Sequence, residues 1–405
     1  MNRLLRFAPL GVLLAASACS TPTLDQRRTA ATPAVAALQR GAFDDAAREA
    51  EARLSADGSN PYARLVRALV RYKKTGHQLS LDVRTGVIGG LASGGFNHKY
   101  LRSALEQAER ELGDVEDDLA SAWREPEISV ELCLACWEID WNGNGRFDSR
   151  DALLMQIEQD AEGNPIPEGD PRRKPTFRLD RGDVAWARAF VSFQRALIDL
   201  VLAYDWAAVD AVVSARRGRD IPDTVTLKLA HPDRIAAAKT RILEGLDRSE
   251  DSRRAYLAET DDDREWVPNP KQQSHPMPLP VDAALYETWG GVVGDLKRLV
   301  SGDEGLSVSE VAQLGDHVWE NPPRGYLDIG RMLSRPKDIV FRVRDLEKLE
   351  RSRDVEGTLA SVLGDTYVSS MKASPLPGRL RRMKSEIDRR EEPLERKLRY
   401  LFWIN

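Results

Sequence analysis

The chain has 405 residues, of which 42% are apolar and 30% charged, and its net charge is −5. This weak acidity is spread along the chain, so no nucleic-acid partner is expected, while the length permits two or three domains or one long helical array. Apolar residues recur every three or four positions in most segments, and only residues 225–229 alternate as a strand does. The pattern predicts an all-α fold: helical hairpins followed by a helical bundle.

Residues 1–18 have the features of a targeting segment. Arg3 and Arg6 precede a short apolar run, and small residues then lead to Cys19. This resembles a bacterial lipoprotein signal, which implies cleavage before Cys19 and attachment of the mature protein to a membrane through lipid on that residue. Ser20 resembles the sorting pattern for the outer membrane, facing the periplasm. The alternative is ordinary secretory cleavage that leaves a free Cys19. No later apolar run is long enough to span a bilayer.

Residues 19–33 are rich in Thr, Pro and Arg and are predicted to be a tether. Residues 34–125 then read as amphipathic helices joined by a turn at Asn60. With Gly41, Phe43 and Ala46 at small and aromatic positions, this segment resembles a tetratricopeptide repeat, which implies a surface for a protein partner. A plain helical hairpin is the alternative interpretation.

Two further features complete this region. The glycine-rich residues 86–95 lack the Lys-Ser/Thr ending of a phosphate loop, so a loop or a tight helix contact is predicted. Residues 100–123 carry one apolar stripe and predict a charged amphipathic helix.

Residues 140–151 place oxygen-bearing side chains at regular intervals around a glycine. Calcium prefers six to eight oxygen ligands, so the chain must offer one at nearly every second residue, and Gly145 allows the sharp turn in the middle. The predicted metal ligands are Asp140, Asn142, Asn144, Arg146 through its carbonyl, Asp148 and Asp151.

This spacing resembles an EF-hand calcium loop, most closely the dockerin variety. The resemblance implies calcium as the bound cofactor, and residues 128–139 are predicted to be the helix that enters the loop, within a calcium segment at 126–160. The alternative interpretation is an Asn/Gly turn before a helix that Asp148 caps.

Cys133 and Cys136 are the two cysteines that remain beside Cys19. In an oxidising compartment three states are open to them: a disulfide, two buried thiols, or a redox or zinc site. The disulfide is preferred, because no helix start follows a strand here and no histidine lies near in sequence.

Residues 161–260 are predicted to form the helical core. Asp180 or Asp183 is expected to cap a long helix at residues 184–213, and two more helices are expected at residues 232–246 and 249–259.

Residues 261–281 are dense in acids and prolines, which preclude a helix, so this loop is either a binding surface or a linker. Residues 282–405 are predicted to form a C-terminal helical region. It includes a capping box from Ser307 to Glu310, and helices at residues 281–300, 341–349, 357–368 and from Arg379 onward.

The sequence contains no recognisable catalytic motif, neither a His-Glu-x-x-His pair nor a Gly-x-Ser-x-Gly elbow. Two functions therefore compete. The first is a calcium-binding envelope lipoprotein that acts as a protein-interaction or scaffolding module. The second is an envelope enzyme acting on glycan, with acids from residues 261–265.

Overall fold

The protein is described by a computed structural model in which most of the described residues are helical, so the predicted all-α class is confirmed. No helix within the described ranges is long and apolar enough to cross a membrane. The described residues are 22–89, 97–140, 144–148, 151, 157–158, 160, 164–209, 223–262, 264–273, 282–315, 322–342 and 355–388.

The helices and strands follow one another along the chain with short connections. The α-helices are α1 (Leu24–Gln39), α2 (Phe43–Ala56), α3 (Pro61–Val83), α5 (His98–Trp123), α7 (Arg181–Leu202), α9 (Pro232–Ala258), α10 (Ala283–Ser301), α11 (Val308–Ala312), α12 (Ile329–Ser334), α14 (Val355–Leu363) and α15 (Leu376–Asp388). Short helical turns are η1 (Arg84–Gly89), η2 (Leu134–Cys136), η3 (Pro171–Arg173), η4 (Gln313–Gly315) and η5 (Gly364–Thr366). The strands are β1 (Val130–Leu132), β2 (Phe177–Leu179), β3 (Tyr204–Asp205), β4 (Thr224–Leu229), β5 (Leu306–Ser307), β6 (Tyr326–Leu327), β7 (Ile339–Arg342) and β8 (Tyr367–Val368).

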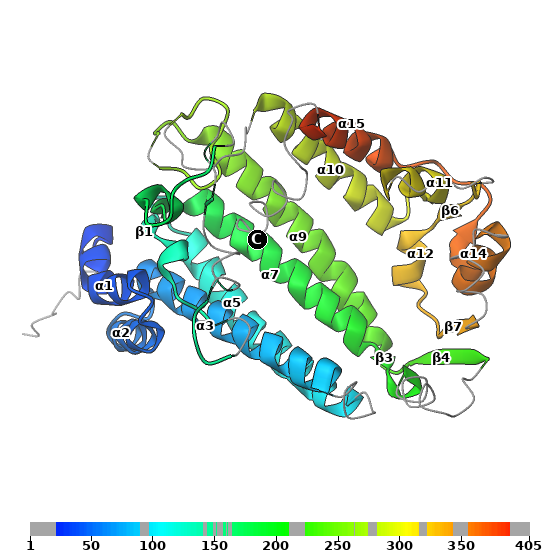
Figure 1. Ribbon diagram of the computed structural model, residues 1–405, viewed down its shortest axis with the longest axis horizontal. Helices are drawn as coiled ribbons and strands as arrows, with labels where there is room; N and C mark the ends of the chain where they lie inside the picture. Colours follow the sequence, from blue (N-terminus) through cyan, green and yellow to red (C-terminus); the bar gives the residue numbers. More distant parts are fainter. Residues whose placement is uncertain are drawn as a thin grey trace, which may run out of the picture.

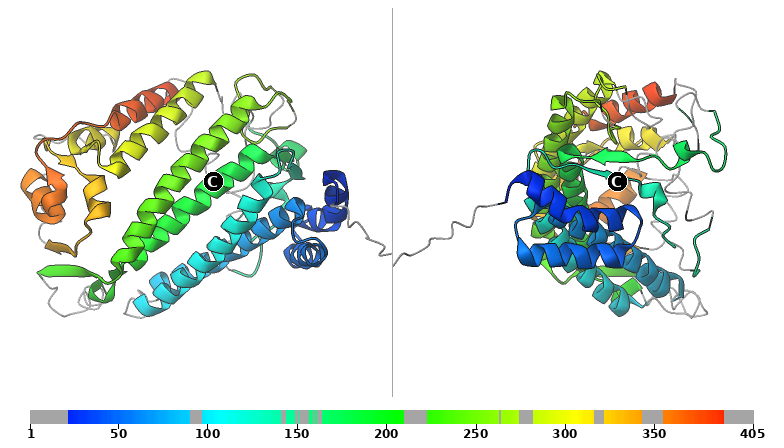
Figure 2. Two further views of the ribbon diagram at one scale, coloured as in Figure 1. Left: turned by 180° about the vertical axis from the view of Figure 1, so that it is seen from behind. Right: turned by 90° about the vertical axis from the view of Figure 1, so that its left-hand side faces the viewer.

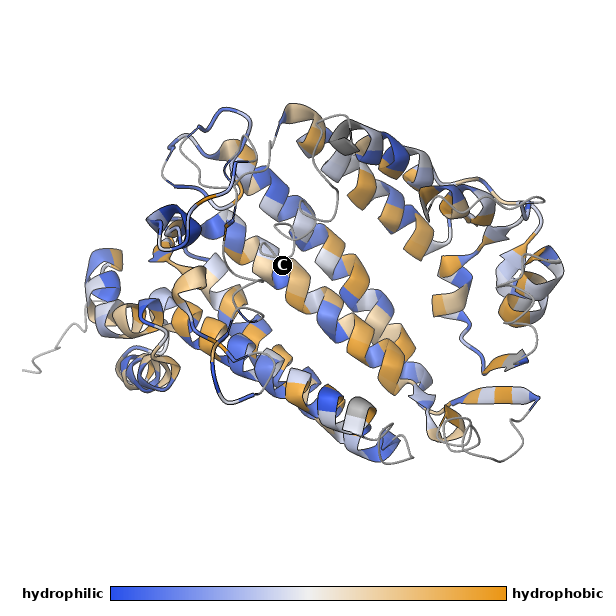
Figure 3. Cartoon of the chain, viewed as in Figure 1, coloured by the Kyte–Doolittle hydropathy of each residue, from blue (hydrophilic) through white to orange (hydrophobic). Residues whose placement is uncertain are grey.

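The long helices form one row, in which α3 contacts α5, α5 contacts α7, α7 contacts α9, and α9 contacts α10 (Figures 1 and 2). Each of these helices carries both polar and apolar residues along its length (Figure 3). Its apolar face can therefore pack on a neighbouring helix while its polar face meets water. The strands pair into three small sheets, ordered β1-β2, β3-β4-β7 and β5-β6-β8.

The segment 24–33, predicted to belong to a tether, is helical and forms the first part of α1. Thr23 and Gln26 make a reciprocal capping box that starts the helix. Ala31 is buried in the core and Leu24 packs against it, so the segment has an apolar face that a tether would lack. The tether prediction is wrong for these residues.

Charged contacts join α3 and α5. The carboxylate of Asp118 on α5 is 1% exposed and accepts hydrogen bonds from Arg64 (2.8 Å) and from both Nε (2.7 Å) and Nη2 (2.6 Å) of Arg67 on α3. The buried charge is therefore paired twice, as a carboxylate away from water must be. Such pairs account for part of the high charge content of the helices.

The neighbouring helices α7 and α9 run antiparallel and come very close at two glycines. A Cβ on Gly182 would lie 2.6 Å from the ring of Tyr256, and a Cβ on Gly245 would lie 2.7 Å from the ring of Phe193. Each aromatic ring thus occupies the space where a side chain would stand. This packing holds the start of α7 beside the end of α9.

Both helix predictions for this pair need correction. The helix expected at 184–213 ends at Leu202, because the carbonyl of Ala203 accepts the N–H groups of Ala230 and His231 (both 2.9 Å) and the chain continues into β3. The two helices expected at 232–246 and 249–259 are one continuous helix, α9, since nothing in its sequence breaks it.

The C-terminal region mixes helices with short strands. The predicted helix at 281–300 is α10, and Ser307 caps α11 by accepting the N–H of Glu310 (3.4 Å). The helix expected at 341–349 is wrong where it is described, because Ile339–Arg342 is β7 and pairs with β4, as the β-branched run there favours. The helix expected at 357–368 ends at Leu363, because Gly364 adopts a φ of +56° and the chain turns into β8.

Candidate functional site

The loop predicted to bind calcium is folded around the carboxylate of Asp140. Its two oxygens accept the backbone N–H groups of Asn144 (3.0 Å) and Gly145 (2.6 Å). The side-chain oxygen of Asn144 accepts the N–H of Arg146 (3.0 Å), and Gly145 has a φ of +87°. These bonds turn the chain sharply at Gly145 and direct the side chains of Asp140 and Asn144 to the inside of the turn.

The two remaining described acids continue the same network. The side-chain amide of Asn144 donates to Asp148 (2.7 Å), and the N–H of Asp148 donates to the buried carboxylate of Asp151 (3.0 Å). Five of the six predicted ligand residues are therefore linked through one network of hydrogen bonds. Asn142 lies outside the described residues.

The chain before the loop is fixed to the N-terminal helices. Cys133 and Cys136 are joined by a disulfide. The indole of Trp137 donates to the carbonyl of Leu38 (2.8 Å) and meets the ring of Phe43 edge-on at 5.3 Å. His77 Nε2 lies 2.8 Å from the carbonyl oxygen of Asp140.

The helix predicted to enter the loop, residues 128–139, is absent. Strand β1 and the turn η2 occupy that segment, because Val130 and Leu132 pair with Leu179 and Phe177 of β2. Tertiary pairing has overridden the local helical pattern. The loop therefore follows a strand and a disulfide-closed turn rather than the helix of a standard EF-hand.

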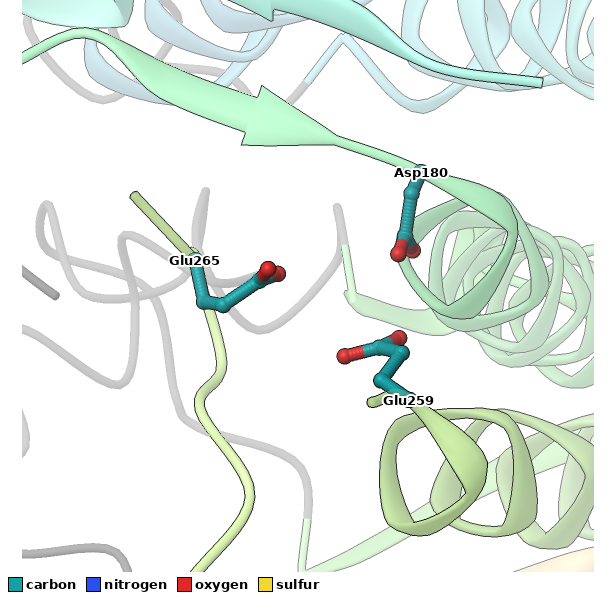
Figure 4. Close-up of side chains that lie close together, drawn as sticks. All are labelled: Asp180, Glu259 and Glu265. Atoms are coloured by element: carbon teal, nitrogen blue, oxygen red, sulfur yellow. The ribbon is translucent and has the colours of Figure 1, made fainter. Parts of the chain in front are cut away.

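A second candidate site lies where α7 begins and α9 ends. Asp180, Glu259 and Glu265 each offer one carboxylate oxygen, and these atoms all lie within 4.8 Å of one another. Figure 4 shows the three side chains converging from three different segments. In the described part of the chain this is the group of acids whose spacing would suit a cation.

Local structure explains how each of the three acids reaches this point. Asp180 follows β2 directly and caps α7, with its carboxylate accepting the N–H of Gly182 (2.7 Å). Glu259 follows the last residue of α9. Glu265 lies beside Arg178 of β2, where the N–H of Arg178 donates to the carbonyl of Arg264 (3.1 Å).

The surroundings of this acidic triad differ on its two sides. On the inner side Asp183 accepts the hydroxyl of Tyr256 (2.7 Å). On the outer side Asp180 and Glu259 line a pocket of about 700 Å³ whose walls carry both arginines and acids. The charged lining residues are Arg28, Glu127, Glu131, Arg178, Asp180, Arg181, Glu259, Asp261 and Arg264.

Burial and mutual repulsion perturb the ionisation of the cluster. Burial, followed by the negative charge of Asp180 and a hydrogen bond with it, raises the pKa of Glu259 to about 10. Burial, with the charge of Asp180 next, also raises the pKa of Asp183 well above its usual value. Burial raises the pKa of Tyr256, with the charge of Asp183 as the second cause. Near neutral pH Glu259 is therefore protonated, although the carboxyl groups around it are close. A protonated carboxyl of this kind is expected in a general acid and in a cation site that holds no ion.

Sequence reasoning found only part of this triad. The sequence offers Asp180 or Asp183 as the cap of one helix and places Glu259 at the end of another. Of the acids expected to form a site at residues 261–265, Asp261 pairs with Arg178 and Asp262 accepts the N–H of Gln273 (2.9 Å). Among the described acids of this loop, Glu265, which is 2% exposed, reaches the triad, while Asp263 lies outside the described residues. The sequence shows an acid at the start of one predicted helix and at the end of another. These acids can be recognised as neighbours only when the pairing of α7 with α9 is known.

Comparisons with protein-family models, with curated proteins and with solved structures each gave no match. Function is therefore argued from the geometry of these two sites.

Proposed function

We propose that this chain is a calcium-binding lipoprotein of the bacterial cell envelope that acts as an interaction or scaffolding module. In this proposal Cys19 carries the lipid, the outer membrane holds the anchor, and the helical row faces the periplasm. Cys19 lies outside the described residues, so the anchor rests on the pattern of residues 1–18. The exposed side chain of Leu197 on α7 offers one apolar contact point for a protein partner.

The observation that supports calcium most is the pair of backbone N–H groups held by Asp140. Those bonds hold the turn through the loop's own groups, so little conformational entropy would be lost when an ion binds. Asp140, Asn144, Asp148 and Asp151 then supply the hard oxygen donors that calcium prefers. Under this proposal Asn142 and the carbonyl of Arg146 complete the coordination.

A calcium titration followed by calorimetry tests the site directly. Extracellular calcium modules bind with dissociation constants of about 10⁻⁴ to 10⁻³ M, and we expect one site in this range. The Asp140→Ala variant should bind at least tenfold more weakly, because the first ligand and the fold of the turn are lost together. The absence of saturable heat in the wild-type protein would contradict the proposal.

Replacing Cys19 with serine tests the membrane anchor. Two or more acyl chains hold a protein stably on a bilayer where one chain is marginal, so the unmodified protein should sediment with the membrane fraction. The Cys19→Ser variant should appear in the soluble periplasmic fraction or keep its signal segment. A variant that stays with membranes after carbonate washing, with the signal removed, would exclude the lipid anchor.

A second candidate function, an enzyme that cleaves glycan, is favoured by the acidic triad. Retaining glycosidases hold two carboxyl groups about 5–5.5 Å apart, one protonated and one ionised. Glu259, whose pKa is raised to about 10, has the protonation state of the acid that gives its proton to the leaving oxygen. Asp180 is hydrogen-bonded to Glu259, so the pair is closer than in those enzymes and would have to separate around a sugar before Asp180 could attack it or activate water. The pocket of about 700 Å³ has room for a sugar ring.

Release of reducing ends from peptidoglycan by the purified protein tests this candidate. We expect the Glu259→Gln and Asp180→Asn variants to lose at least about 10²-fold in rate, the typical contribution of one acid–base group. Asp233→Asn, which removes an exposed carboxylate at the opposite end of α9, serves as the matched control. Equal release by wild type and Glu259→Gln, or none by either, would reject the enzyme.

A further inference from the structure

A separate pocket of about 690 Å³ lies among α10, α11 and the start of α15. It is distinct from the acidic triad, because the two pockets share no lining residue. Its lining residues are Arg298, Glu304, Glu310, Lys372, Ala373, Ser374, Pro375, Gly378 and Arg382.

One carboxylate in this pocket is only half satisfied. Glu304 is 2% exposed, and its Oε1 receives both Arg298 Nε (3.0 Å) and Lys372 Nζ (2.8 Å). Its Oε2 is buried and has no hydrogen-bond partner in the described structure. The hydrogen bond from Lys372 is the main cause that lowers the pKa of Glu304, so the group is ionised. An ionised oxygen without a donor is costly, and the pocket therefore offers a strong acceptor.

The lining also holds a second acid, Glu310, which pairs with Arg381 (3.6 Å), and the cation Arg382. Arg382 is exposed and its guanidinium forms no ion pair within the described part of the chain. A Cβ on Gly378 would lie 4.0 Å from Arg382 Nη1, so the guanidinium stands beside the first turn of α15. In that turn the N–H of Leu376 donates to Ser374 Oγ (3.4 Å), that of Arg379 donates to the carbonyl of Pro375 (3.0 Å), and Pro377 has none. The N–H of Gly378 is therefore the one that can meet an anion, at the positive end of the helix. An anionic group placed there would meet both Arg382 and the helix terminus.

We propose that this pocket binds a small zwitterion: its ammonium group donates to Glu304 Oε2, and its carboxylate lies between Arg382 and the first turn of α15. Lys372 bonds the other oxygen of Glu304, also lines the pocket, and has a side chain that is 74% exposed. It can therefore swing aside and open Oε2 to an incoming ammonium with little loss of packing. A free amino acid and the ends of a short peptide share this chemistry.

Calorimetric titration of the full chain with L-alanine, with trialanine, and with acetate and methylammonium as single-charge probes tests the proposal. L-alanine or trialanine should bind saturably, and whichever binds more tightly identifies the source. Arg382→Ala and Glu304→Gln should each weaken that binding roughly 10- to 100-fold, the loss of one hydrogen bond to a charged group. Arg335→Ala is the matched control, because Arg335 is exposed, makes no ion pair within the described residues and does not line the pocket.

Several results would overturn the site. They are the absence of saturable binding by both zwitterions, equally tight binding of acetate or methylammonium, or unchanged binding in Arg382→Ala. Arg382 is exposed and makes no ion pair in the described structure, so its removal leaves the fold intact. Circular dichroism of the Glu304→Gln variant would show whether weaker binding comes from the lost contact or from loss of the fold. The result for Arg382→Ala is valid whether or not Glu304→Gln folds.

Discussion

Calcium at about 100 times its dissociation constant should add about 2.7 kcal/mol to the free energy of unfolding, because the ion binds the folded loop and not the unfolded chain. Three aspartates repel one another in the empty loop, and a divalent ion relieves that repulsion. The gain should appear as a higher unfolding midpoint in millimolar calcium than in chelator. It should also be transmitted to the N-terminal helices, since Trp137 and His77 tie the loop to them.

The Asp140→Ala variant should lose this calcium-dependent gain. Without calcium the variant should unfold close to the wild type, because water can replace the carboxylate at the exposed N–H groups of Asn144 and Gly145. Asp45→Ala is the matched control: it removes a carboxylate that is 54% exposed and pairs with Arg48 in its own helix. An equal calcium shift in Asp140→Ala would mean that the loop is only a turn.

The helical class and many helix starts could be predicted from the sequence, because the signals are local. Asp180 caps α7 and Ser307 caps α11 through bonds that span two or three residues. Periodicity likewise predicted α5 and α10. Such signals need no knowledge of distant parts of the chain.

The errors arose where distant segments meet. Residues 128–139 have an apolar pattern that suits a helix, but the pairing of Val130 with Leu179 makes a strand of part of them. The same reason applies to Ile339, which pairs with Leu227 of β4. A partner more than 40 residues away in the chain cannot be inferred from local periodicity.

The acidic triad was hidden for a related reason. Its three members come from the start of α7, the end of α9 and the loop after it. The close approach of Gly182 to Tyr256 and the hydrogen bond from Tyr256 to Asp183 bring the two helix ends together. The calcium loop is the opposite case, because all its proposed ligands lie within twelve residues. Contiguous sites can be predicted from spacing, whereas convergent sites require the fold.

The Glu259→Gln variant should be more stable than the wild type, and its advantage should grow as the pH rises. The folded-state pKa of Glu259 is about 10, whereas the unfolded value is about 4.3. Between these values the folded protein binds one more proton than the unfolded chain. Wild-type stability therefore falls with rising pH, by up to about 1.4 kcal/mol per unit. Glutamine has no proton to lose and can still donate to Asp180, so the variant escapes this loss.

Urea unfolding at pH 5, 6, 7 and 8 measures the difference between the two proteins. Glu131→Gln is the matched control, because Glu131 lines the same pocket but its side chain is 49% exposed, and its difference from wild type should stay flat. Adding a divalent cation separates two states of the triad. A bound cation would keep Glu259 ionised in the folded protein, so the slope for the wild type would disappear. If, in the presence of chelator, the Glu259→Gln variant is no more stable than the wild type at any pH, then Glu259 is ionised in the folded protein. Its proposed role as a general acid would then have no basis.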